Sequence, residues 1–169
     1  IIKIFQNKDI LKVGFNIKDQ IKILEKYRVR GIENIFDVSI AHYLLNPDMR
    51  HNIDILSENY LQYQSLDINS ILGKGKQKRK ISDLSEDKQM FYCCELTDIQ
   101  LQLSVIFTSQ LKEIKVFNLF KNIEMPLISV LTKMEMEGIN LDTKMLAEFS
   151  INLTEEIKST EDIICKMSR

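Results

Sequence analysis

Few side chains in this sequence have the type and spacing that catalysis or metal binding requires. His42 and His51 are the only histidines, and neither has partners at the spacing of a catalytic or metal-binding set. His51 follows Arg50 at a position where a helix is expected to begin, so helix capping or surface exposure accounts better for it. The histidines therefore predict no active site.

The three cysteines do not indicate a metal or redox site either. Cys93, Cys94 and Cys165 are an odd number, and the adjacent Cys93 and Cys94 do not form a Cys-x-x-Cys pair. We expect all three to be reduced, small apolar side chains of a cytoplasmic protein, because thiols remain unoxidised in that compartment.

A basic run within residues 73–80, GKGKQKRK, is a candidate nucleic-acid-binding segment. Such a run can contact phosphates without reading sequence, and the alternative is a solvated loop. The formal net charge of the whole chain is -1, so no overall basic field indicates a nucleic-acid partner. The basic residues of the run are Lys74, Lys76, Lys78, Arg79 and Lys80.

Composition is that of an ordinary soluble domain, alone or with an appendage. The chain has 169 residues, of which 44% are apolar and 28% charged, and only 5 Gly and 2 Pro, which favours long helices. No apolar run reaches the length of a membrane span, and no signal peptide is visible. Because the chain begins with Ile in the middle of a pattern, we expect it to be part of something longer.

The first two-thirds of the sequence predicts short strands between helices. Strands are expected at 11–15 and near residues 35–36, after an N-terminal stretch that ends a helix. Asp37 is expected to cap a helix that Pro47 ends. Further helices are predicted at 18–27, 53–60 and 86–111, with a short helix and a basic loop between the last two. In the helix at 86–111, successive turns along one side are marked by Phe91, Cys94 or Glu95, Asp98, Leu101 and Val105.

From residue 116 onward the pattern predicts two long helices. In the first, Pro126 lies inside the apolar pattern, so a kink is expected near Asn122. Gly138 stands where a left-handed helix end is needed, and Asp142 can cap the last helix. We expect an antiparallel pair. Its apolar stripes are Phe120, Ile123, Leu127, Val130, Leu131 and Met134 in the first helix, and Leu146, Phe149, Leu153 and Ile157 in the second.

Several stretches in order resemble the family A DNA polymerases, the family of bacterial DNA polymerase I. They include KVGFNIKDQIKIL, GIENIFDVSIAHYLLNP, YCCELTDIQLQL and, most specifically, FKNIEMPLISVLTKMEMEGINLD. The resemblance implies a proofreading 3′–5′ exonuclease domain in residues 1–112 and the start of the polymerase domain, at the thumb base, in 113–169. The implied fold is α/β and helix-rich, the C-terminal part of a ribonuclease H-like exonuclease fold. Its first strands, with an Asp-x-Glu motif, would precede residue 1, so we expect only two strands here.

Proofreading in that family is a two-metal reaction, and Mg²⁺ or Mn²⁺ needs carboxylate ligands. The resemblance places the Asn-x-x-x-Asp motif at Asn16 and Gln20, and the Tyr-x-x-x-Asp motif at Tyr92 and Leu96. Both aspartate positions have lost their charge. Without metals, Asn16 is better explained as a turn residue at a strand end, and Tyr92 as a half-buried aromatic on a helix.

Three nearby carboxylates are candidate substitutes for the missing ligands. Asp19 and Glu95 each lie one residue early, about 100° around a helix, and Asp98 lies two residues late, about 200° around. None replaces its neighbour without a rebuilt backbone. We therefore expect no catalytic residue and no metal ligand in this chain.

The resulting interpretation is part of a DNA-directed DNA polymerase for replication and repair, with an exonuclease-like domain that has lost proofreading and serves as scaffold. The implied partner is DNA, through the parent protein, in the cytoplasm and not at a membrane. We expect Mg²⁺ in the parent polymerase and no cofactor in this chain. Two alternatives stay open: an active two-metal exonuclease with substitute carboxylates, and a stand-alone helical interaction module.

Overall fold

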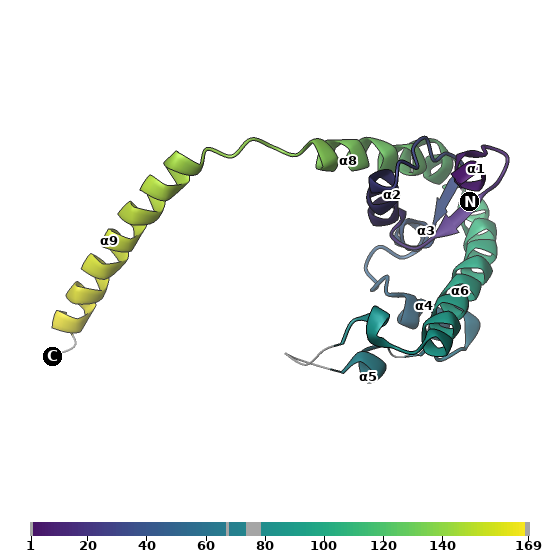
Figure 1. Ribbon diagram of the computed structural model, residues 1–169, viewed down its shortest axis with the longest axis horizontal. Coiled ribbons are helices and arrows are strands. Elements are labelled where there is room, and N and C mark those ends of the chain that lie inside the picture. The colour runs from purple at the N-terminus through teal and green to yellow at the C-terminus, as the bar shows by residue number, and fades with distance from the viewer. Residues whose placement is uncertain (1, 67, 74–78, 168–169) are drawn as a thin grey trace. The chain divides into compact units, whose positions relative to one another are not determined.

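The computed structural model describes residues 2–66, 68–73 and 79–167 (Figure 1). The chain divides into two compact units, Ile1–Met136 and Glu137–Arg169, which are described separately below. Of the basic run, Lys74, Lys76 and Lys78 lie outside the described residues.

Two short strands form the sheet of the first unit. β1 (Lys12–Gly14) and β2 (Ile35–Asp37) pair in parallel, with Val13 opposite Phe36. α2 (Ile17–Lys26) follows β1 almost directly. Within the described residues the sheet has two strands, as expected. The complete ribonuclease H-like topology remains a prediction.

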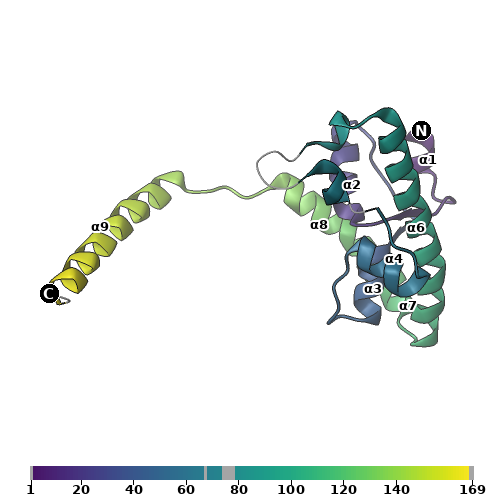
Figure 2. The same cartoon turned by 90° about the horizontal axis from the view of Figure 1, so that it is seen from below.

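Helices dominate the rest of the first unit and enclose its core. α6 contacts β1 and packs along α3 and α4, which the two views show beside it (Figure 1, Figure 2). Residues from all these elements join one buried cluster. The helices are α1 (Ile2–Gln6), α3 (Val38–Leu45), α4 (Ile53–Leu61), α5 (Ile68–Leu72) and α6 (Glu86–Glu113), with a 3₁₀ turn at Ile81–Asp83.

The buried face of α6 is not the side that the sequence marks. Phe91, Leu101 and Val105 are 58%, 56% and 68% exposed. α6 carries apolar residues on more than one side, and only the side that meets β1, α3 and α4 becomes buried. That side runs through residues spaced four apart, which are Ile99, Leu103, Phe107 and Leu111.

A π-helical turn interrupts the helix predicted from residue 116. α7 (Phe117–Leu119) leads into the π-helical turn, Phe120–Glu124, and α8 (Met125–Glu137) follows. The N–H of Met125 bonds to the carbonyl of Phe120, five residues back. Asn122, near which a kink is predicted, lies in this turn, and Pro126 has no N–H to offer the carbonyl of Asn122. The kink itself stays a prediction.

The π-helical turn also shifts the buried face of α8 by one residue. Phe120 is buried against Phe36, with ring centroids 4.7 Å apart, but the rest of the predicted stripe is exposed. Because a π-helical turn holds one residue more than an α-helical turn, the residues after it are rotated by about 100°. The residues that face the core are Met125, Ile128 and Thr132.

The second unit contains one long helix, α9 (Thr143–Met167). Gly138 has φ 75, the left-handed conformation expected there, and the carboxylate of Asp142 accepts hydrogen bonds from the N–H groups of Lys144 and Met145. No residue of α9 is buried. The predicted antiparallel pairing of α8 with α9 stays a prediction. Among the described residues, no helix has the length and hydropathy needed to cross a membrane.

Candidate functional site at the strand ends

The two parallel strands end at the same edge of the sheet, where Asn16 begins the Asn-x-x-x-Asp motif. Asn16 follows β1 in the left-handed conformation, with φ 54 and ψ 52, which asparagine tolerates better than most residues. Its Oδ1 accepts a hydrogen bond from Ser39 Oγ at 3.1 Å, at the start of α3. Asn16 is thus a turn residue that links the beginnings of α2 and α3.

Gln20 occupies the position where the resemblance places a metal-binding aspartate. It is exposed in the first turns of α2, and its Nε2 donates a hydrogen bond to the carbonyl oxygen of Phe15 at 2.8 Å. A carboxylate has no proton to donate to that carbonyl and would meet its negative end. The side chain at this position therefore satisfies a backbone acceptor, a role that a metal-binding carboxylate cannot take.

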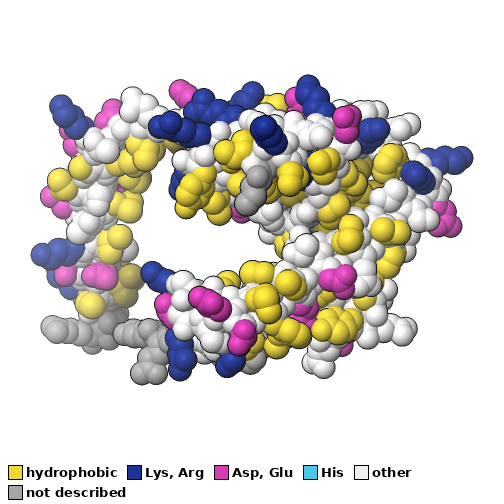
Figure 3. Space-filling view, turned by 45° about the vertical axis from the view of Figure 1, so that its right-hand side comes forward, with side chains coloured by type: hydrophobic (Ala, Val, Ile, Leu, Met, Phe, Trp, Pro, Cys, Tyr) yellow, Lys and Arg dark blue, Asp and Glu magenta, His cyan; other side chains and the backbone are white. Residues whose placement is uncertain are grey.

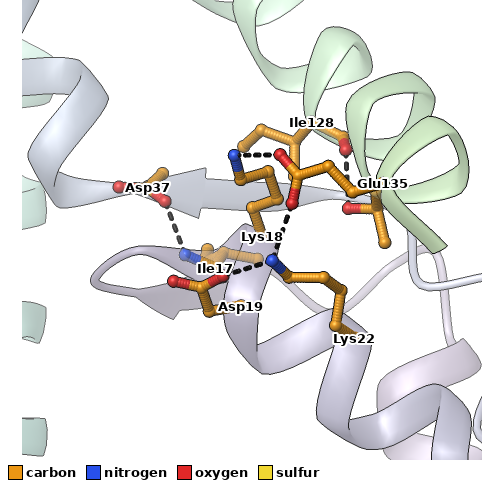
Figure 4. A network of polar contacts seen from close by, with 8 residues as sticks. Ile17, Lys18, Asp19, Lys22, Asp37, Ile128 and Glu135 are labelled. Atoms are coloured by element: carbon orange, nitrogen blue, oxygen red, sulfur yellow. Dashed lines mark hydrogen bonds and ion pairs between the residues drawn. The ribbon is translucent and has the colours of Figure 1, made fainter. Parts of the chain in front are cut away.

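Asp37, at the end of β2, is the buried carboxylate of this edge. Only 1% of it is exposed, and both of its oxygens are occupied by backbone donors. Oδ2 accepts from the N–H of Ile17 at 2.6 Å (Figure 4). Oδ1 accepts from the N–H groups of Ser39 at 2.9 Å and Ile40 at 3.3 Å. Burial raises the pKa of Asp37, and the backbone donors offset part of that rise. One side chain thus caps both α2 and α3, although the sequence predicted only the cap on α3.

The Tyr-x-x-x-Asp motif lies on the N-terminal half of α6. Tyr92 is half-buried, as expected for a helix aromatic, and burial raises the pKa of its hydroxyl. Leu96 is also half-buried and offers no oxygen to a cation. None of the hydrogen bonds described for Asn16 and Gln20 reaches these two residues.

The three candidate substitute carboxylates are each engaged elsewhere. Asp19 pairs with Lys22 of its own helix at 2.6 Å. Glu95 accepts from the hydroxyl of Tyr63 at 2.7 Å and from the N–H of Leu66. The remaining one, Asp98, accepts from Nε2 of Gln102 at 2.6 Å, one turn along α6.

These residues do not fit the Mg²⁺ or Mn²⁺ that the exonuclease reaction requires. Among the described residues, no group of three or more His, Cys, Asp or Glu side chains could hold a metal ion. Both oxygens of Asp37 accept from backbone N–H groups, and the motif positions carry an amide and an isobutyl group. Paired divalent cations have no charged oxygen ligand at these two motif positions.

The side of α2 facing α8 carries a cluster of ion pairs (Figure 4). Glu135 on α8 accepts from Lys18 Nζ at 2.5 Å and from Lys22 Nζ at 2.7 Å, and Lys22 also pairs with Asp19. The hydrogen bonds from Lys18 and Lys22 lower the pKa of Glu135. The start of α2 and the end of α8 thus together hold a neutral set of two lysines and two carboxylates.

The structure joins the two histidines, a contact that sequence spacing did not predict. Nδ1 of His42 lies 2.7 Å from Nδ1 of His51, so one ring donates and the other accepts. His42 is fully buried beside Tyr60 and Phe107, and its Nε2 has no hydrogen-bond partner among the described residues. Burial, then the neighbouring His51, lowers the pKa of His42. His51 is half-buried rather than a freely exposed or capping residue.

Other residues singled out by the sequence lie on the surface. Arg79 and Lys80, the described part of the basic run, are exposed just before the 3₁₀ turn. Cys93 and Cys94 are exposed on α6 as free thiols. On the face in Figure 3, basic and acidic side chains lie between exposed apolar ones.

Comparisons with known proteins place the chain in a family. Residues 1–112 match the family model described as 3′–5′ exonuclease. DNA polymerase I of Borreliella burgdorferi is 33% identical over 154 residues, which are 91% of this chain and 17% of that protein. DNA polymerase I of Rhizobium leguminosarum is 27% identical over 164 residues, 95% of this chain and 16% of that protein. The chain thus spans about a sixth of the length of these relatives. With the match over residues 1–112, these similarities establish that the chain belongs to the 3′–5′ exonuclease family of the family A DNA polymerases.

Proposed function

We propose that this chain is part of a DNA polymerase of the polymerase I type, and that its exonuclease-like domain has lost proofreading. The relatives named DNA polymerase I support the first half. The parent reaction would be template-directed addition of deoxynucleotides with Mg²⁺, on DNA in the cytoplasm. In this proposal, residues 1–112 form the exonuclease-like domain and residues 113–169 begin the polymerase domain.

One observation supports the loss of proofreading. Gln20, at the aspartate position of the Asn-x-x-x-Asp motif, donates a hydrogen bond where a metal ligand would have to accept. The amide of Gln20 is bonded to the carbonyl of Phe15, so the strand end is satisfied without a cation. Leu96 removes the second ligand, and a half-buried leucine favours a dry surface. Cleavage that depends on paired cations has no support at either position.

The packing of α8 supports the scaffold role. One face of α8 is buried against the exonuclease-like core through Met125, Ile128 and Thr132. The hydroxyl of Thr132 donates to the carbonyl of Ile128 at 2.7 Å, so this polar residue can be buried there. Another side of α8 carries exposed apolar residues, a pattern typical of a helix held between two layers. These residues are Leu127, Val130, Leu131 and Met134.

An active nuclease with substitute ligands is the competing proposal. Asp19, Glu95 and Asp98 would each have to leave a hydrogen bond of 2.6 to 2.7 Å. Nuclease activity would also require them to approach one another from two different helices. The described contacts therefore favour the inactive form.

A trimming assay tests the proposal. The longest natural protein that contains this chain would be incubated with 3′-labelled single-stranded DNA and Mn²⁺, and we expect the label to remain attached. A polymerase I with aspartates at both motif positions serves as the positive control. Trimming that disappears in Asp19→Asn, Glu95→Gln or Asp98→Asn would reject the proposal and establish the substitute ligands.

A further inference from the structure

The resemblance places a metal ligand in the first turns of α2. Side chains of these turns form ion pairs with α8. Lys18, Asp19 and Lys22 all belong to these turns, and Lys18 and Lys22 reach across to Glu135 (Figure 4). Both oxygens of Glu135 are used, Oε1 by Lys18 and Oε2 by Lys22. These turns therefore already have a partner in the segment beyond the matched residues 1–112.

Glu135 continues the buried face of α8 by one more turn. Met125, Ile128 and Thr132 are buried at spacings of three and four residues, and Glu135 follows three residues later. Its side chain is 39% exposed, at the rim of the packed face. The carboxylate therefore stands where the apolar contact ends and water begins.

Ion pairs join the first turns of α2 to the end of α8, beside the buried core to which both helices contribute. Between the two helices lies a hollow of about 560 Å³. Residues of both helices line it, among them Ile21, Glu25, Ser129, Thr132 and Lys133. Close packing is incomplete around this hollow, so the ion-pair cluster adds a polar link between α2 and the end of α8.

We propose that Glu135 is a positioning residue, and that the first turns of α2 act as a docking surface for the segment that begins the polymerase domain. Lys18 and Lys22 hold the last turns of α8 against the exonuclease-like unit and so fix the direction in which the chain leaves it. This inference rests on the proposed scaffold function and names the contact by which the scaffold acts.

Amide hydrogen exchange, measured on the longest natural protein containing the chain, tests the proposal. In Glu135→Gln, and separately in Lys18→Gln with Lys22→Gln, we expect exchange of amides 131–136 to rise about threefold. Combining all three changes should give no further rise, because either set alone removes the same contact. Salt at about 1 M should raise exchange in the unmodified protein and leave Glu135→Gln unchanged, because it screens exposed ion pairs.

Two controls separate positioning from a general effect on stability. Glu137→Gln changes the same helix about 200° away from Glu135 and should leave exchange unchanged. Lys18→Arg with Lys22→Arg keeps both charges and should retain protection. Unchanged exchange in Glu135→Gln, or additive effects of the two sets, would overturn the proposal. Nuclease activity in the unmodified protein would instead contradict the loss of proofreading and leave this result untouched.

Discussion

The ends of β1 and β2 differ in where they keep negative charge. Both strands run in parallel, end at one edge and lead directly into a helix. At the end of β2 the carboxylate of Asp37 is buried and accepts from three backbone N–H groups. Beyond the end of β1 an exposed amide, Gln20, donates to a backbone carbonyl. The end of β2 thus keeps a buried carboxylate, whereas the motif position beyond β1 carries an uncharged amide.

The largest expected effect comes from removing the carboxylate at the end of β2. Asp37→Ala leaves the N–H groups of Ile17, Ser39 and Ile40 without their acceptor in a buried site, so we expect a loss of about 3 kcal/mol in unfolding free energy. Urea unfolding followed by circular dichroism measures it. The control is Asp19→Ala, which removes an exposed carboxylate next to Gln20 and should change stability little. Equal losses of unfolding free energy in the two variants would mean that the buried carboxylate of Asp37 stabilises the fold no more than the exposed carboxylate of Asp19 does.

A smaller effect is the dependence of stability on pH. Burial raises the pKa of Asp37 above its ordinary value of 3.8. Between 3.8 and the raised pKa the folded state binds more protons than the unfolded state, so stability falls as pH rises through that window. Urea unfolding at stepped pH should show this fall in the unmodified chain and not in Asp37→Asn. A rise through the same window would mean that the backbone donors outweigh burial.

The smallest expected effect is at the ligand position itself. Gln20→Glu keeps the shape of the side chain but cannot donate to Phe15, so we expect a loss of about 0.5 kcal/mol. Gln6→Glu is the matched control, because Gln6 also donates its amide to a backbone carbonyl, that of Arg30 at 3.0 Å. Thermal unfolding with and without Mn²⁺ should respond equally in both variants. A selective stabilisation of Gln20→Glu by Mn²⁺ would mean that this strand end still gathers cations.

Local signals in the sequence were sufficient for most of the elements. The Asp37 cap, the left-handed Gly138 and the Asp142 cap each follow from one residue and its neighbours, and all three are confirmed. The two strands and the long α6 follow from short apolar runs and helical spacing. These features depend on contacts within a few residues, which sequence reasoning can see.

Long-range contacts decided what the sequence could not supply. The reach of Asp37 to Ile17 spans twenty residues and depends on the parallel pairing of β1 with β2. The contact of His42 with His51 needs α3 and the following loop to fold back. The buried face of α6 depends on which side α3 and α4 cover, because apolar residues lie on both sides. Each of these contacts depends on residues that are distant in the sequence and become neighbours only in the folded chain.

The wide turn at Phe120–Glu124 makes the junction after it sensitive to length. Deleting one codon between Met125 and Glu135, in the regular helix beyond that turn, would rotate the residues after the deletion by about 100° and swing Glu135 away from its lysines. Substitutions on the exposed side of α8 leave that register intact. Relatives that share this junction should therefore differ in residue type far more freely than in the spacing between Met125 and Glu135.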